Sequence, residues 1–287
     1  LDVVLALAAA SVARAGGNQA AVLANYDEMK EGLSFWFAID TLEYLQRGDV
    51  ATVAAQYSYL NSPLALLTQG AYGVEMSRAL FAEVYRHWRS LPADARPRLF
   101  LHGLSLGALN SDRSFDLFDI IDQPFDGALW SGPPFRTETW RQVTAQRDPG
   151  SPYWRPTFRG GSVVRFMTQG PQPEPRYRDW GAFRMLFLQQ ASDPITFFSF
   201  ESAWREPEWM RAPRGPDVSP DLRWFPVVTM LQLAADMAFG SAPPGFGHEF
   251  APADYIYAWV ALTEPEGLTE ADLERLRSLF RQPPAAD

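Results

Sequence analysis

The sequence predicts an α/β fold in which a mostly parallel central sheet is flanked by helices. Short runs rich in β-branched and aromatic residues alternate with longer amphipathic stretches, as in repeated βα units. Most of these runs are apolar throughout, which is typical of strands covered by helices on both faces. We expect a single domain over residues 1–287, because sheet elements resume after the Pro- and Gly-rich stretches 148–175 and 207–220.

The elements follow one another from the first residues. The apolar run 1–10 predicts an amphipathic helix that ends near Gly16 and Gly17, since Asp2 interrupts the run and no basic segment precedes it. This run is also too short to span a bilayer. Strands are then expected at 20–26, 50–59, 98–103, 127–130, 162–167 and 184–190, and helices at 35–47, 72–91 and 253–262.

Composition excludes several classes of function. The net charge is −9 and the pI is near 4.9, so a nucleic-acid partner, which requires basic clusters, is not expected. The chain has no cysteine and only three scattered histidines, and we therefore expect no disulfide, no metal centre and no cofactor.

A Gly-x-Ser-x-Gly pattern at residues 103–107 carries the main chemical signal. It follows an apolar strand and precedes a plausible helix, which is the context that a nucleophilic serine needs. Glycines on either side let the chain reverse sharply, so that Ser105 is exposed at the carboxyl end of the sheet. The amide of Leu106, at the start of the helix, would then donate to a developing oxyanion.

A nucleophilic serine requires a base, and His248 is the best candidate. It lies in a Pro- and Gly-rich loop near the C-terminus, where the order Ser, Asp, His places the base. His87 falls within a helix and is expected to pack or to face solvent. His102, three residues before Ser105, is expected to support the structure or to contact the substrate site.

Asp193 is the candidate for the acid that orients His248. It follows the apolar strand 184–190, and catalytic groups gather at the carboxyl ends of the strands in such sheets. An Asp-Pro turn initiator is the alternative interpretation. Asp217 and Asp221 are the other candidates for this acid.

The remaining parts of the site are located more loosely. A second oxyanion donor is expected in the loop after the first predicted strand, near Tyr26 and Asp27. Segments 59–67, 130–135 and 194–200 should reach the same edge of the sheet, and their apolar side chains indicate a pocket for an acyl or alkyl group.

The chain resembles a bacterial α/β-hydrolase family of lipases and esterases. The resemblance covers about residues 38–262 and rests on DTLEYL at 40–45, AAQYSYL at 54–60, GLSLG at 103–107, GALWSGPP at 127–134, RDPGSP at 147–152, LQQASDP at 188–194, RGPDVSP at 214–220, RWFPVVT at 223–229 and the pair Gly247-His248. It implies the α/β-hydrolase fold, with the family's Ser, Asp and His at Ser105, Asp193 and His248.

Two further expectations come from this resemblance. Members usually have a Gly- or Thr-Pro-rich loop after the first strand, whereas this chain has NYDEMKEG at 25–32, a departure that bears on the oxyanion loop. Members also often carry membrane helices ahead of the hydrolase domain, so we expect the parent chain to be membrane-attached and residues 1–287 to be its soluble catalytic portion.

The function expected first is hydrolysis of a carboxylic ester, of a small molecule or a lipid, through an acyl-enzyme on Ser105. Acyl transfer to an alcohol or a sugar would use the same three residues, and a peptidase or thioesterase ranks third. An inactive binding or scaffold protein on the same fold is the alternative from a different class.

Overall fold

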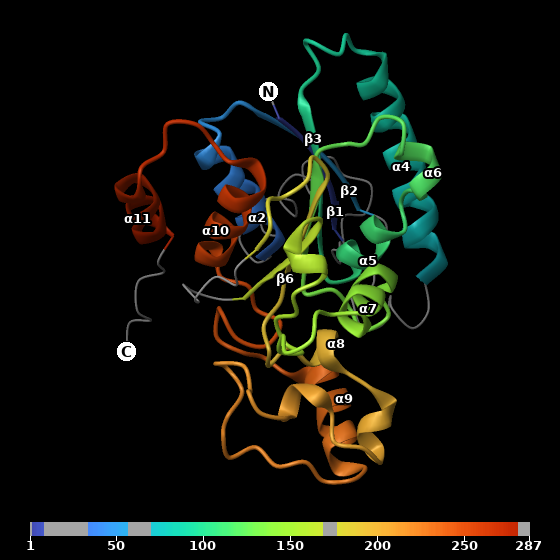
Figure 1. Cartoon of the computed structure of the whole chain (residues 1–287), viewed down its shortest axis with the longest axis vertical. Helices are drawn as coiled ribbons and strands as arrows, with labels where there is room; N and C mark the ends of the chain where they lie inside the picture. Colours follow the sequence, from blue (N-terminus) through green and yellow to red (C-terminus); the bar gives the residue numbers. More distant parts are fainter. Residues whose placement is uncertain (1, 9–33, 57–69, 169–176, 281–287) are drawn as a thin grey trace, which may run out of the picture.

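The computed structural model describes residues 2–8, 34–56, 70–168 and 177–280 and contains a six-stranded parallel sheet (Figure 1). The strand order is β2-β1-β3-β4-β6-β5, and every neighbouring pair is parallel. The predicted α/β class with a mostly parallel sheet is therefore confirmed. The strands are β1 (Asp2–Ala8), β2 (Val50–Gln56), β3 (Arg98–Leu104), β4 (Gly127–Ser131), β5 (Val164–Met167) and β6 (Arg184–Leu188).

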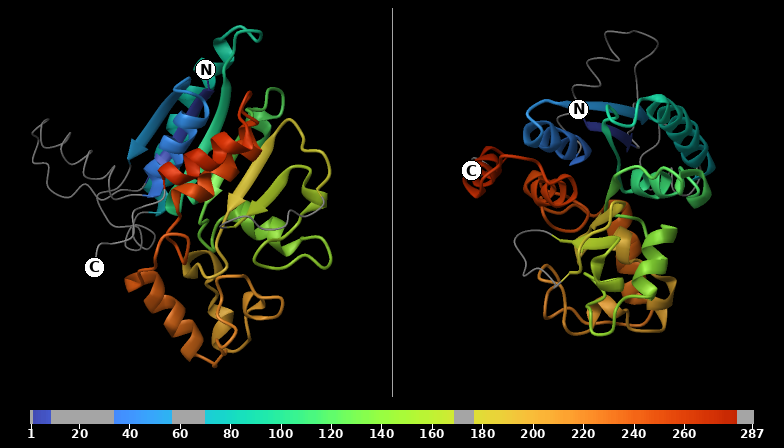
Figure 2. Two further views of the ribbon diagram at one scale, coloured as in Figure 1. Left: turned by 90° about the vertical axis from the view of Figure 1, so that its left-hand side faces the viewer. Right: turned by 45° about the horizontal axis from the view of Figure 1, so that its top comes forward.

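Helices cover both faces of the sheet (Figures 1 and 2). On one side lie α2 (Ser34–Leu45), α10 (Pro252–Thr263) and α11 (Glu270–Leu279), and on the other α4 (Gly70–Ser90), α5 (Leu106–Asp112), α6 (Leu117–Ile120) and α7 (Glu138–Ala145). Beyond the carboxyl ends of the strands lie α8 (Pro194–Phe197), α9 (Val228–Phe239) and the short 3-10 segments η2 (Phe200–Ala203) and η3 (Glu208–Met210), while a third, η1 (Arg159–Gly161), precedes β5.

The two faces of the sheet form two separate hydrophobic clusters. Successive residues of a strand point to opposite faces, so Leu99 and Leu101 join the cluster on the α4 side while Phe100 joins the one on the α10 side. In β4, Trp130 and Leu129 divide in the same way. Burial on both faces explains why these strands are apolar without alternation.

The first element corrects the sequence-based prediction. Residues expected to form a helix are the strand β1, which pairs with β2 on one side and β3 on the other. A short apolar run cannot be assigned to helix or strand from its periodicity, and the β-branched pair Val3-Val4 favours the strand in a central position. The strand predicted at 20–26 lies outside the described residues.

The other predicted elements are present with shifts at their ends. The strand predicted at 50–59 ends at Gln56, beyond which residues 57–59 are not described. The strand predicted at 162–167 begins at Val164, and the helix predicted at 253–262 extends by one residue at each end.

Candidate active site

Ser105 lies on a sharp turn between β3 and α5. Its backbone has φ 55° and ψ −121°, a sparsely populated conformation with positive φ that a non-glycine residue adopts at a cost of about 1–3 kcal/mol. A Cβ on Gly103 would lie 2.4 Å from the backbone of Gly107, so only glycine lets the strand and the helix approach this closely. The strand, turn and helix expected around this serine are thus present.

Backbone hydrogen bonds tie this turn to the neighbouring strand ends. The N–H of Ser105 donates to the carbonyl of Ser131, at the end of β4, over 2.9 Å. The next residue, Gly132, donates to the carbonyl of Leu188, at the end of β6, also over 2.9 Å. The carboxyl ends of β3, β4 and β6 therefore meet at the turn that carries Ser105.

Asp193 is a fully buried carboxylate that begins α8. Its Oδ1 accepts hydrogen bonds from the amides of Ile195 (2.8 Å) and Thr196 (3.3 Å), and its Oδ2 accepts from the Thr196 hydroxyl (3.0 Å). Pro194 at the first helical position has no N–H to satisfy. The Asp-Pro turn and the proposed acid are therefore compatible, since the same carboxylate caps the helix and has room for a further donor.

That further donor is His248. Its Nδ1 lies 2.8 Å from Oδ2 of Asp193, and because a carboxylate only accepts, Nδ1 carries the proton. The other ring nitrogen, Nε2, is buried and has no hydrogen-bond partner among the residues that the structure describes. This tautomer leaves a lone pair on Nε2 that can accept a proton.

The imidazole of His248 lies over the turn that follows β4. A Cβ added to Gly132 would lie 2.5 Å from Cε1 and 2.9 Å from Nδ1 of this ring. Gly132 directly follows Ser131, which accepts the N–H of Ser105, so the histidine and the serine occupy the same corner of the sheet.

The surroundings of His248 raise the pKa of its imidazole. Burial lowers this pKa, but the negative charge of Asp193, its hydrogen bond to the ring and the charge of Glu249 outweigh burial, and the pKa lies above its usual value of 6.5. These surroundings therefore favour the protonated form of the His248 imidazole.

A second carboxylate holds the loop that carries His248. Asp217 Oδ2 accepts from the amide (2.8 Å) and the hydroxyl (2.6 Å) of Ser192, and the same hydroxyl accepts from the amide of Gly247 (2.9 Å). Asp217, one of the other candidates for the orienting acid, therefore contacts Ser192 instead of the histidine. Asp221 is exposed.

Sequence reasoning missed the roles of Ser192 and Asp217. Ser192 directly precedes the candidate acid, and this position is the one local signal of its role. Asp217 is 25 residues away in a Pro-rich stretch, and nothing local links the two side chains.

The other two histidines lie apart from this corner. His102 is completely buried against α10, where its Nδ1–H donates to the carbonyl of Leu129 (3.0 Å) and its ring lies 5.8 Å from that of Trp259. Burial lowers its pKa to about 4, although the bond to Leu129 opposes this shift, so the ring is neutral. Of the two roles expected for His102, support of the structure and contact with the substrate site, its position fits the first. His87 is exposed on α4.

The expected oxyanion donors are described only in part. Leu106 is the first residue of α5, where amides have no intrahelical partner. Tyr26 and Asp27 lie in 9–33 and the pocket segment 59–67 lies in 57–69, both outside the described residues, so these roles stay predictions.

Clusters of metal-ligating side chains and membrane-spanning helices are both lacking in the described part of the chain. Among its residues, no group of three or more His, Cys, Asp or Glu side chains could hold a metal ion. Over the same residues, no helix is long and apolar enough to cross a membrane. Membrane attachment of the parent chain stays a prediction.

Comparison with known proteins identifies the family. The alpha/beta-hydrolase family matches residues 2–276, and the chain belongs to it. No curated protein matched the sequence. Among solved structures, an acetylxylan esterase has a TM-score of 0.34 at 12% identity, with 68% of this chain and 84% of that chain covered. A structure from a study of the lipolytic enzymes LipS and LipT has a TM-score of 0.27 at 12% identity, covering 70% and 76%.

Proposed function

We propose that this member of the alpha/beta-hydrolase family is a serine esterase that cleaves carboxylic esters through an acyl-enzyme on Ser105. The observation that carries the proposal is the protonation pattern of His248. Its Nδ1–H donates to Asp193, while its Nε2 has no hydrogen-bond partner among the described residues. The ring lies at the same strand ends as the strained turn that carries Ser105. A general base needs this arrangement.

The reaction has two steps. As Ser105 Oγ bonds to the ester carbonyl carbon, its proton moves to His248 Nε2 and the carbonyl electron pair moves to oxygen. Collapse of this tetrahedral species breaks the bond to the alcohol oxygen, which leaves with the proton from Nε2. Water then attacks the acyl-enzyme, gives a proton to Nε2, and releases the carboxylic acid while Ser105 regains its proton.

The buried groups support each charge that develops. Asp193 accepts four hydrogen bonds, and as a carboxylate it stabilises the imidazolium without taking the proton. The amide of Leu106 would donate to the oxyanion from the start of α5, which needs no movement of the backbone at the moment of reaction.

Fluorophosphonate labelling followed by peptide mass spectrometry tests this mechanism. We expect stoichiometric labelling at Ser105 in the wild type, loss of labelling in His248→Ala, and wild-type labelling in the control His87→Ala, which alters an exposed histidine on α4. Release of p-nitrophenol from esters of increasing acyl length would then define the preferred acid. Folded wild-type protein that is not labelled at Ser105 would overturn the esterase mechanism and favour a binding protein.

A further inference from the structure

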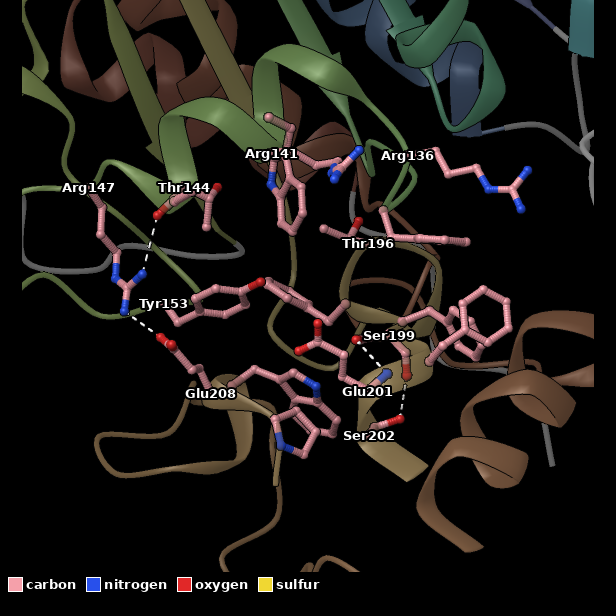
Figure 3. A pocket seen from close by; sticks show the side chains of 18 of the residues that line it. Arg136, Arg141, Thr144, Arg147, Tyr153, Thr196, Ser199, Glu201, Ser202 and Glu208 are labelled. Carbon is pink, nitrogen blue, oxygen red and sulfur yellow. Dashed lines mark hydrogen bonds and ion pairs between the residues drawn. The ribbon is translucent and has the colours of Figure 1, made fainter. Parts of the chain in front are cut away.

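A large cavity, drawn from close by in Figure 3, is lined in part by residues that follow the candidate acid Asp193 along the chain. It has a volume of about 1010 Å³, is partly open to solvent, and is lined by residues of α7, by residues that follow α7 as far as Tyr153, and by the segment from Thr196 to Trp209. This volume is at the upper end of the range for small-molecule sites in proteins. The esterase mechanism makes no use of the cavity.

The charged side chains of the cavity balance one another. Four arginines and four glutamates line it: Arg136, Arg141, Arg147, Arg205, Glu138, Glu201, Glu206 and Glu208. Of these, Arg147 pairs with Glu208 and Arg141 pairs with Glu138, while Glu206 pairs with Arg211. A ligand that fits this lining has no net charge and offers both donors and acceptors, because a charged ligand would leave half of these groups without a favourable partner.

Several of these groups are accessible. Arg141, Glu201 and Arg205 are exposed. Figure 3 shows the Glu201 carboxylate and the Tyr153 side chain extending toward one another in the cavity, and the charge of Glu201 is one of the causes that raise the pKa of the Tyr153 hydroxyl, after burial and Glu208. Planar guanidinium and carboxylate groups can each bind two adjacent hydroxyls at once.

Aromatic rings supply the rest of the lining. Trp140, Tyr153 and Phe197 pack against one another with ring centroids 5.8–6.4 Å apart and form a rigid wall. Phe200 also lines the cavity, is 59% exposed, and makes edge-to-face contacts with Phe135 and Phe198. Aromatic ring faces attract C–H groups because the ring carries negative charge above and below its plane.

We propose that this cavity binds a neutral carbohydrate segment. Hydroxyl pairs of a sugar match the mixed carboxylates and guanidiniums, and the C–H faces of its rings match the aromatic lining.

The cavity is connected to the triad through a single residue. Thr196 lines it and also donates its hydroxyl to Asp193. A bound sugar that contacts Thr196 would therefore lie one side chain away from Asp193.

Isothermal titration calorimetry with xylohexaose, cellohexaose and maltohexaose tests the proposal. These probes contain no ester, so their binding does not depend on the esterase mechanism, and Ser105→Ala should bind them like the wild type. We expect saturable binding of at least one probe and an increase of at least about tenfold in its Kd for the double variant Arg141→Ala/Glu201→Ala, because hydrogen bonds to charged groups are lost.

The matched control is Glu83→Ala/Arg86→Ala, which removes an exposed ion pair of opposite charges on α4, away from the cavity. It should leave the Kd unchanged. The proposal is overturned if none of the three probes binds, if both double variants weaken binding equally, or if a neutral peptide of similar length binds more tightly than every sugar.

Discussion

Replacing Ser192 by alanine should slow the reaction of Ser105 with a fluorophosphonate, although Ser192 is not itself a reacting group. The hydroxyl of Ser192 joins the candidate acid segment to the loop of His248, because it accepts from the Gly247 amide and donates to Asp217. Without it, the loop loses the anchor directly before the histidine.

The size of the effect follows from the two hydrogen bonds. The neutral bond from Gly247 contributes about 1 kcal/mol and the bond to the Asp217 carboxylate about 1.5–3 kcal/mol. Asp217 keeps its second bond, to the Ser192 amide. We expect the free energy of unfolding to fall by about 2.5–4 kcal/mol. In the folded variant the labelling rate constant should fall by about fivefold, since the loop that carries His248 loses the Gly247 bond and about 1 kcal/mol corresponds to that factor.

Labelling is followed by intact-protein mass spectrometry at a temperature where circular dichroism shows the variant to be folded. The control is Ser199→Ala, which also removes a serine hydroxyl that accepts a backbone amide, at the start of η2. This control should be labelled at the wild-type rate. If folded Ser192→Ala also reacts at that rate, the anchor does not position His248 and the reasoning is wrong.

The same corner and the core beside it lead to three more predictions. First, the pKa of His248 is raised and its Nε2 must be unprotonated to act as a base, so the labelling rate should increase with pH through a midpoint above 6.5. Asp193→Asn should lower both the maximal rate and this midpoint. An unchanged midpoint would show that Asp193 does not cause the raised pKa. Second, the new Cβ in Gly132→Ala would lie 2.5 Å from the imidazole of His248, so the labelling rate should fall by about a hundredfold. The control is Gly150→Ala, which also lies at a positive φ but has open space around it, and which should be labelled at the wild-type rate. The third prediction concerns His102, whose pKa is about 4 in the folded protein. Its contribution to stability is therefore present above pH 6.5 and is lost as the pH falls toward 4. Over this interval the free energy of unfolding, measured by denaturant titration, should fall by about 3 kcal/mol less in His102→Gln than in the wild type, and an equal fall in both proteins would refute the shift.

The pH dependence of stability has the opposite sign for His248. A raised pKa means that the folded state binds the proton more tightly than the unfolded chain. This stabilisation is fully present below 6.5, the unfolded value, and is lost as pH rises through the folded pKa. His248→Gln should remove it, which comparison of the unfolding curves at about pH 6 and about pH 9 can measure.

Local features of the sequence determined the turn that carries Ser105 and most of the sheet. The Gly-x-Ser-x-Gly spacing suffices for the turn, because the contact that excludes a Cβ on Gly103 is made by Gly107, only four residues further on. Buried strands are recognisable because covering both faces requires continuous apolar runs. The scarcity of histidine makes His248 a strong candidate for the base from the sequence alone.

Only the tertiary structure decided how distant segments meet. His248 and Asp193 are 55 residues apart, and Ser192 and Asp217 are 25 apart, so no local pattern links either pair. The first strand was assigned wrongly for a related reason, since its place between β2 and β3 depends on pairing with residues far along the chain. The cavity lined by Thr196 likewise arises from two segments brought together by folding. Steric contacts between residues a few positions apart can be predicted from their spacing in the sequence. Contacts between distant residues depend instead on how the chain between them folds back, and this is decided by the packing of the whole molecule.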